Sequence, residues 1–345
     1  MIELVCNLHS HTVFSDGAGL HREIVAAAAQ AGLDVVAVTD HNVWVGGLQG
    51  YYGRVLLLIG EEVHDPCRQP QVNHALILGA DAELAPLAGS PQVLIDAARE
   101  RGGLVFLAHP VEFAPRWLGE PALPWVDRAV VGFTGLELWN TMSEFKARLR
   151  TPVHALYYAF FPQRFLRGPF REAIAWWEQL WLEGVPAVAI GGADAHGHTY
   201  RLGPLQRVLF PYGWLFRAVN THLLISQPLR RQVEADWPVI REALRSGRAW
   251  IANDGLGSSR GFRFEARSGH RRATMGEALP RAGAVRFEAE APLPGAFRLV
   301  RFGTGVVAQG RGLRFQHLTV EPGIYRLEVY RRGRLWILTN PIRIE

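Results

Sequence analysis

Residues 1–41, MIELVCNLHSHTVFSDGAGLHREIVAAAAQAGLDVVAVTDH, predict a strand, a helix and a second strand in direct succession. Leu4–Leu8 has the length and apolarity of a strand. His21–Ala31 is rich in alanine, the best helix former, and Gly32 is a typical helix stop. Leu33–Thr39 is a short apolar run of the kind found in parallel strands that are covered on both faces. The segment therefore predicts one β/α unit.

The same alternation continues through the first two hundred residues. Apolar runs predict further strands at Val55–Ile59, Ala75–Leu78, Leu104–Ala108, Gly135–Leu138 and Ala187–Ile190, and helical patterns lie at Pro91–Arg101, Arg171–Glu183 and Val239–Ser246. Repeated β/α units predict a parallel sheet, and this many units predict a closed or nearly closed barrel.

The sequence changes character after about residue 255. Short alternating segments punctuated by Gly and Pro predict antiparallel strands at Phe262–Ala266, Ala284–Ala289, Phe297–Phe302, Ile324–Tyr330 and Leu335–Leu338. We therefore expect an α/β barrel domain at residues 1–255 and a small antiparallel β-sandwich domain at residues 256–345. The boundary is expected in the Gly- and Ser-rich segment Asn253–Arg260.

Composition restricts the class of protein. The chain has 345 residues, of which 48% are apolar and 20% charged, so it is expected to be globular and not disordered. It has no apolar run of 18 residues, and its start is expected to form a strand and not a signal peptide. Two cysteines, Cys6 and Cys67, are too few for a disulfide framework. We expect a cytoplasmic protein without a membrane segment.

The formal net charge is +5, and Lys146 is the only lysine among 37 basic residues. Genomic composition or heat adaptation explains an excess of arginine. The alternative explanation is that the positive charge attracts an anionic small-molecule substrate. Because the basic residues are spread along the chain, bulk nucleic-acid binding is not expected. The sequence leaves a homo-oligomer open.

Histidines and carboxylates gather where the predicted strands end or begin. They are His9, His11, Asp16, Asp40, His41, Glu61, Glu62, His74, His109, Glu137, Asp194 and His196. Single motifs of this kind are often chance or satisfied polar pairs. Strand ends of a parallel barrel share one rim, however, so these side chains are expected to converge. Mixed imidazole and carboxylate ligands suit Zn, Mn or Fe, and their number exceeds what one tetrahedral ion needs. We expect a multinuclear metal site.

The motifs HSHTVFSDG, VTDHN, GEEV, LAHP, ELWN and GGADAH, in this order, resemble the polymerase and histidinol phosphatase (PHP) superfamily of metal-dependent hydrolases. This resemblance covers residues 1 to about 250. It implies a distorted, TIM-like (β/α)7 barrel that holds two or three divalent ions.

The resemblance also implies a ligand set. His9, His11, Glu62 and Asp194 would hold one ion, and Glu62 would bridge to a second ion held by His74 and His109. Asp16, His41 and His196 would hold a third. Glu62 is preferred over Glu61 because the family ligand usually takes the third position of G-x-E.

Other residues receive weaker assignments. Asp40, Glu61, His64, Glu137 and His198 are candidates for contacts with the ligands. An aromatic-rich insert at Val153–Trp181 is expected to pack as helices, with a wall or lid over the cleft as the alternative. Arg164, Arg167 and Arg171 in that insert, and Arg201, are weak candidates for substrate binding. His21, His154, His222, His270 and His317 are expected to be surface or core polar residues.

Three functions remain open. A phosphoesterase acting on a small phosphate ester or nucleotide is favoured, with a water activated by two metal ions as the nucleophile. The tail segments IREALRSGRAWIAND, ATMGEAL and LTNPIRI are similar to the carbaryl-hydrolase-like branch. That similarity makes hydrolysis of a carbamate, ester or amide the alternative. A metal-binding accessory domain without turnover is the third.

Overall fold

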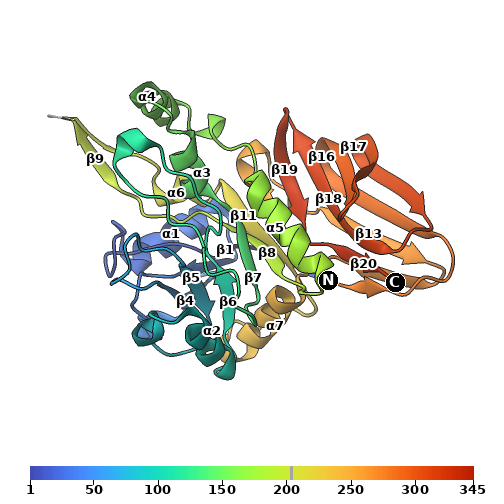
Figure 1. The fold of residues 1–345 in the computed structure, drawn as a ribbon, viewed down its shortest axis with the longest axis horizontal. Coiled ribbons are helices and arrows are strands. Elements are labelled where there is room, and N and C mark those ends of the chain that lie inside the picture. The colour runs from blue at the N-terminus through green and yellow to red at the C-terminus, as the bar shows by residue number, and fades with distance from the viewer. Residues whose placement is uncertain (203–204) are drawn as a thin grey trace.

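The structure is a computed structural model that describes residues 1–202 and 205–345. For residues 116, 200–202 and 205–207 only the backbone is described. Figure 1 shows a helix-containing N-terminal part beside a C-terminal part made of strands. Among the described residues, no helix combines the length and apolarity needed to cross a membrane.

The N-terminal part is a mixed α/β structure. Its strands are β1 (Ile2–Asn7), β2 (Val35–Val38), β3 (Gly50–Tyr52), β4 (Val55–Val63), β5 (Ala75–Leu78), β6 (Leu104–Leu107), β7 (Gly135–Asn140), β8 (Val188–Gly192), β9 (Thr199–Leu202), β10 (Leu205–Val208), β11 (Val219–Ile225) and β12 (Ala249–Asn253). Its helices are α1 (His21–Ala31), α2 (Pro91–Glu100), α3 (Thr141–Arg148), α4 (Pro152–Phe160), α5 (Arg171–Leu182), α6 (Tyr212–Leu215) and α7 (Val233–Ser246).

The main sheet of this part is not wholly parallel. β1, β2 and β4 pair in parallel, as do β6, β7 and β8. β5 is antiparallel to both β4 and β6, because the segment between β4 and β5 contains no crossover helix that would return the chain to a parallel start. The expectation of a parallel sheet is therefore wrong at β5. Within the described chain, β8 and β1 share no ladder, and a single bridge between Ser10 and Ala195 joins the segments that follow them.

The C-terminal part contains antiparallel strands, as expected. They are β13 (Arg263–Ser268), β14 (Arg271–Thr274), β15 (Ala278–Leu279), β16 (Val285–Arg301), β17 (Gly305–Thr319), β18 (Gly323–Arg331), β19 (Arg334–Thr339) and β20 (Ile342–Ile344). Two predicted strands are joined in the single strand β16, and β17, which pairs with it, was not predicted. Nearly all pairings here are antiparallel, with β15 and β20 the parallel exception.

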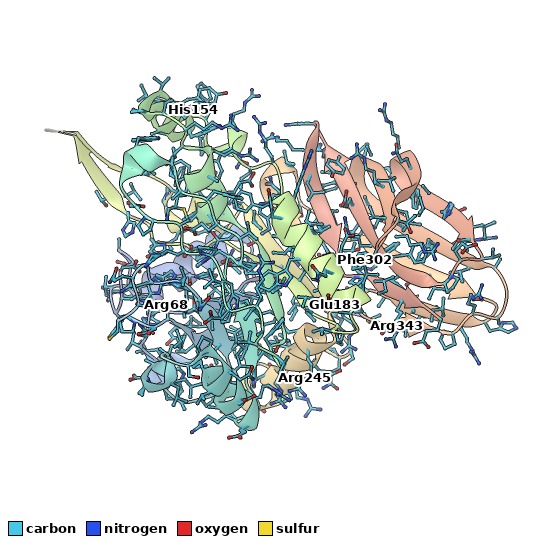
Figure 2. The ribbon with its side chains drawn as sticks, in the orientation of Figure 1. Arg68, His154, Glu183, Arg245, Phe302 and Arg343 are labelled. Carbon is cyan, nitrogen blue, oxygen red and sulfur yellow. The ribbon has the colours of Figure 1, made fainter. Side chains whose placement is uncertain are left out.

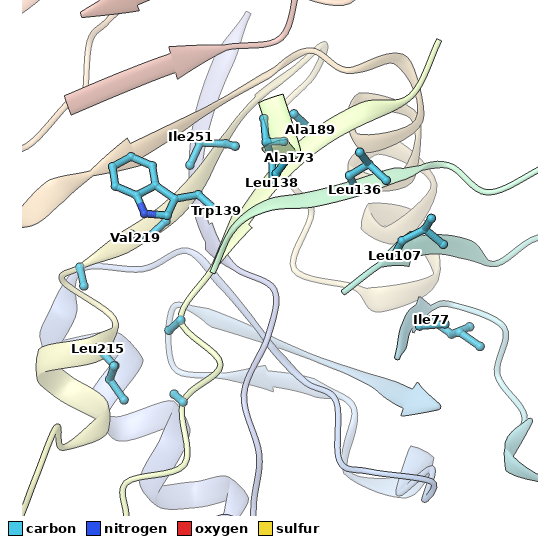
Figure 3. Close-up of a cluster of buried hydrophobic side chains, with 14 of the residues drawn as sticks. Ile77, Leu107, Leu136, Leu138, Trp139, Ala173, Ala189, Leu215, Val219 and Ile251 are labelled. Carbon is cyan, nitrogen blue, oxygen red and sulfur yellow. The ribbon is translucent and has the colours of Figure 1, made fainter. Parts of the chain in front are cut away.

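A large apolar cluster fixes the strands that carry the site. Leu136, Leu138 and Trp139 of β7 pack with Ala173 of α5 and Ile251 of β12, all of them buried. Figure 3 shows these side chains between the strands. Each of the buried leucines and isoleucines contributes roughly 1.5–3 kcal/mol through removal of apolar surface from water. The strand ends are therefore held in place by a packed interior.

The two parts of the chain are in direct contact. β12 pairs with β19, so the sheet runs from the N-terminal part into the C-terminal part. Trp177 of α5 contacts Phe302 edge-on, with ring centroids 5.3 Å apart, where Figure 2 labels Phe302. Buried Arg326 bonds to Glu178 of α5 and to Glu328, the latter at 2.9 Å.

Candidate metal centre

The strand pairing brings the predicted residues to one edge of the sheet. His9 and His11 follow β1, His41 follows β2, and Glu62 lies near the end of β4. Because β5 runs antiparallel to β4, with Val63 paired to Ala75, the residue that precedes β5 lies at the same edge. His74 is that residue. This explains why it comes before its strand, whereas His109 follows β6.

The first group joins His9, His11, Glu62 and Asp194, whose candidate ligand atoms lie within 4.8 Å of one another. Glu62 Oε2 is 3.0 Å from His9 Nε2 and 3.1 Å from His11 Nε2. Asp194 Oδ1 is 3.3 and 3.1 Å from the same two nitrogens. A tetrahedral ion with bonds of about 2.0–2.1 Å places its ligand atoms about 3.3 Å apart. The spacing of the four atoms therefore fits one ion.

The second group uses the other oxygen of Glu62. Its Oε1 lies 2.9 Å from His74 Nδ1 and 3.1 Å from His109 Nε2. One carboxylate thus connects two groups of imidazoles, and it is 1% exposed. A buried carboxylate is costly unless it is paired or coordinates a metal ion.

The third group joins His11, Asp16, His41 and His196. Asp16 Oδ1 is 3.3 Å from His196 Nε2, and Asp16 Oδ2 is 3.7 Å from His41 Nε2. The His11 ring stacks on those of His41 and His196, with centroids 4.4 and 4.3 Å apart. This group is the more open one, because the Asp16 side chain is 52% exposed.

The ring nitrogens that point away from Glu62 form hydrogen bonds, and these bonds test whether the cluster suits metal cations. His74 Nε2 donates to Gln71 O at 2.7 Å, and His109 Nδ1 donates to Leu123 O at 3.2 Å. Imidazoles bind metal ions only as neutral rings, and in that form the nitrogens of His74 and His109 that face Glu62 are acceptors. Two acceptors facing each other repel unless a cation lies between them. The donor set therefore fits divalent ions.

His9 and His196 show the same pattern. His9 Nδ1 donates to Glu137 Oε1 at 2.9 Å, so in the neutral, metal-binding form of the ring Nε2 is the acceptor that faces Glu62 and Asp194. His196 Nδ1 donates to the backbone oxygen of Asp194 at 2.8 Å, which leaves its Nε2 facing Asp16. Outer hydrogen bonds of this kind orient metal-binding histidines in proteins.

Burial and neighbouring charges favour the deprotonated, metal-binding form at two residues of the cluster. Burial raises the pKa of Glu62, but the surrounding histidines, His9 first, outweigh it and hold this pKa well below its usual value. Burial lowers the pKa of His41 to about 3, so this ring is neutral. Metal ligands must be deprotonated, as Glu62 and His41 are at neutral pH.

Backbone conformation sets two of these residues apart. His109 has φ 27° and Asp194 has φ 53°, values that residues other than glycine rarely adopt. Such conformations cost about 1–3 kcal/mol each and persist where the surrounding structure enforces them, often at functional sites. Both residues point their side chains into the ligand groups.

The weaker candidates lie around this cluster in different ways. Asp40 accepts hydrogen bonds from Thr12 N, Thr12 Oγ1 and Ser15 Oγ, each at 2.6 Å, and so shapes the turn that carries Asp16. Glu61 faces away and accepts from Leu84 N at 2.9 Å.

Two further histidines flank the groups. The His64 ring stacks on His74 with centroids 4.3 Å apart, and both belong to a further group with His41. The His198 ring lies 5.1 Å from that of His196.

Three of the four predicted arginines lie away from the cavity over the cluster. Arg164, Arg167 and Arg171 are not among the residues that line the cavity over the cluster. The side chain of Arg201 lies outside the described residues. Substrate binding by these arginines stays a prediction.

A polar group on the cavity wall was missed by the sequence analysis. Lys146 Nζ donates to Glu112 Oε1 at 2.8 Å, and Ser143 Oγ donates to Glu112 Oε2 at 2.9 Å. All three residues line the cavity. The only available signals were the position of Glu112 three residues after His109 and the uniqueness of Lys146.

Comparison with known proteins gives three findings. The PHP domain model matches residues 7–118. An uncharacterized protein of Methanocaldococcus jannaschii is 30% identical over 131 residues, which cover 33% of this chain and 72% of the relative. A two-domain protein of Bacteroides vulgatus, described as containing a predicted PHP-like metal-dependent phosphoesterase, has a TM-score of 0.45 and 15% identity, covering 99% of this chain and 95% of that one.

The segment matched by the family model begins just before His9 and ends after His109, so it contains the residues that form the first two groups except Asp194. The relative from Methanocaldococcus jannaschii is matched over most of its length. Residues 7–118 therefore match the PHP domain family.

Proposed function

We propose that this protein is a metal-dependent hydrolase, with a phosphate ester as the favoured substrate. The observation that carries the proposal is the double use of Glu62, whose two oxygens face separate sets of imidazole nitrogens. The match of residues 7–118 to the PHP domain family agrees with it.

The ligand assignment is part of the proposal. His9, His11, Glu62 and Asp194 would hold one ion, Glu62, His74 and His109 a second, and Asp16, His41 and His196 a third. Bound divalent ions of the Mn, Fe or Zn type supply Lewis acidity toward a phosphoryl oxygen and lower the pKa of water. The proposed barrel at residues 1–255 carries every one of these residues.

The chain's own residues prepare the site for this chemistry. Glu137, Gln71 O and Leu123 O fix the orientation of His9, His74 and His109, so that three nitrogens face inward with their lone pairs. Asp40 holds the turn before Asp16. Fixed groups of this kind cost no reorganisation during reaction.

A second candidate is hydrolysis of a carbamate, ester or amide bond. The mainly apolar wall of the cavity over the cluster favours it, since that wall suits an uncharged substrate. We also propose, from the tail segments, that the chain belongs to the carbaryl-hydrolase-like branch.

The first experiment is elemental mass spectrometry of the purified protein without added metal or chelator. Two to three equivalents of Mn, Fe or Zn are expected. The metal-loaded protein is then given a phosphate ester and an aryl carbamate with the same leaving group. Turnover of the phosphate ester supports the first candidate, and turnover of the carbamate alone supports the second. Bound metal without turnover of either would favour a binding domain.

A further inference from the structure

A cavity of about 660 Å³ opens on the candidate metal centre. Glu62, His41 and Asp194 form part of its lining, so whatever occupies the cavity touches the metal-binding groups. Pockets of about 300–1,000 Å³ hold ligands of drug size. The volume is therefore larger than a small phosphate ester such as glycerol phosphate needs.

Two segments that follow β6 and β7 build the wall opposite the ligands. Trp117 and Leu123 come from the loop after β6, and Phe145 and Leu149 come from α3 and the residue that follows it. Trp117 Nε1 donates to the backbone oxygen of Leu149 at 2.6 Å, which ties the two segments together. The wall is thus apolar and braced.

Helix α4 completes the wall on its outer side. Ala155, Leu156 and Ala159 line the cavity, and residues 155 and 159 are one turn apart on the same face. In Figure 1, α4 lies at the top of the N-terminal part, above α3. Leu156 keeps 64% of its surface exposed, so an apolar ligand would cover surface that now faces solvent.

The charge of this wall is small. Lys146 Nζ donates to Glu112 Oε1 and to Pro121 O, both at 2.8 Å, so its charge is balanced by a carboxylate. No arginine is among the described residues that line the cavity. Outside the metal-binding groups, the described wall offers apolar surface, the ion pair of Glu112 and Lys146 with Ser143 beside it, and the exposed carboxylate of Glu120, which disfavours a second anionic group on the ligand.

We propose that the substrate is a phosphate ester of a bulky apolar alcohol that contains a ring. The phosphate group that reacts is the only charged group of this substrate. This inference rests on the proposed function, because it places the scissile group at the metal centre. Hydrolysis would add water across the P–O bond and break it, with the proton going to the departing alcohol. The products are the apolar alcohol and inorganic phosphate.

The test compares substrates that differ only in the part that fills the cavity. Metal-loaded protein is given 2-(1-naphthyl)ethyl phosphate and ethyl phosphate, both esters of primary alcohols, and release of phosphate is measured. Adenosine monophosphate serves as a nucleotide comparison. We expect kcat/KM for the naphthylethyl ester to exceed that of each of the others by about a hundredfold, because apolar groups in a fitting pocket contribute roughly tenfold or more each.

Two variants in α4 test whether the apolar wall causes the preference for the naphthylethyl ester. Leu156→Ala should lower the ratio of kcat/KM for the naphthylethyl ester to kcat/KM for ethyl phosphate about tenfold. Val153→Ala is the matched control, since Val153 lies on α4, is 75% exposed and is not part of the lining. Equal losses in both variants, or an equal loss for both esters in Leu156→Ala, would contradict the proposal.

Equilibrium dialysis of 2-(1-naphthyl)ethanol against the metal-loaded protein separates the two proposals. In one outcome the alcohol binds, Leu156→Ala weakens this binding, and no ester releases phosphate. This outcome would overturn the phosphoesterase function and support the preference of the cavity for an apolar ligand. Release of phosphate from ethyl phosphate as fast as from the naphthylethyl ester, without binding of the alcohol, would support the function and overturn the inference.

Discussion

Glu137 Oε1 lies 2.9 Å from His9 Nδ1, so a carboxylate in β7 fixes the ring that follows β1. The other oxygen of Glu137 accepts from His109 N at 3.1 Å and from Asn140 Nδ2 at 2.9 Å. Glu137 therefore orients one candidate ligand through its ring and a second through its backbone, without facing the proposed ions itself.

Glu137→Gln should weaken metal binding. The amide has one oxygen where the carboxylate has two, so its NH2 group faces either His9 Nδ1 or the donors His109 N and Asn140 Nδ2. Either orientation loses an acceptor that now orients a candidate ligand. Loss of such outer contacts typically lowers metal affinity 10–100-fold. Competition with a chromogenic chelator measures the affinity directly.

The matched control for that change is Glu172→Gln, an exposed carboxylate in the first turn of α5 that is not in the metal-binding groups. Unchanged affinity is expected there. Equal affinity in Glu137→Gln and the unmodified protein would show that the contact with His9 does not matter for metal binding.

Gly192 has no side chain, and the space that a Cβ would take is occupied by Glu137 and His9. A Cβ at this position would lie 2.4 Å from Glu137 Oε1 and 2.9 Å from the Cβ of His9. Gly192→Ala should therefore displace one of them, lower the metal content and cost about 1–3 kcal/mol of unfolding free energy. Urea unfolding and elemental mass spectrometry check both effects.

Gly89→Ala is the corresponding control, because a Cβ there meets nothing within 4 Å. It should leave both the metal content and the urea midpoint near those of the unmodified protein. A full metal complement in Gly192→Ala would mean that the site tolerates the displacement.

Glu62 and Glu61 offer a test of the ligand choice on adjacent positions. Successive side chains of a strand point to opposite faces, and only Glu62 faces the imidazoles. Glu62→Gln should lose at least two equivalents of metal. Glu61→Gln should keep them, because burial raises the pKa of Glu61 to about 7 and a neutral amide suits that environment. Full metal content in Glu62→Gln would contradict the assignment of Glu62 as a ligand shared by two ions.

Local signals explain which elements the sequence predicts well. α1 spans His21–Ala31 as expected, because its alanines favour a helix and Gly32 ends it with φ 86°. β16 was expected as two strands, because Pro292, Pro294 and Gly295 resemble a turn. The structure instead continues the strand through them with a shift in register.

Elements that depend on distant partners were missed. β11 contains Asn220, Thr221 and His222, which break the apolar pattern, and each is buried because it bonds to residues far away in sequence. The strand-end histidines were predicted to converge because their motifs are local. The pairing of Glu112 with Lys146 was not, since it depends on how a loop packs against α3.

A buried charge network away from the metal centre predicts how stability changes with pH. His222 Nδ1 lies 2.8 Å from Glu3 Oε1 and its Nε2 lies 3.0 Å from Asp254 Oδ2. Burial lowers the pKa of His222, but the charge of Asp254 and the hydrogen bonds that His222 donates to Asp254 and Glu3 outweigh it and raise the pKa to about 9. The folded protein therefore holds this proton more tightly than the unfolded chain does.

A raised folded-state pKa contributes stability that is complete below the unfolded value of about 6.5 and is lost as pH rises through about 9. At about 1.4 kcal/mol for each pKa unit, this network contributes roughly 3 kcal/mol. We expect the unfolding free energy in urea to fall by about that amount between pH 6.5 and pH 9.5. His222→Gln removes the titrating group, so its loss over the same interval should be smaller by a similar amount. Parallel pH profiles for the two proteins would show that the proton on His222 does not stabilise the fold.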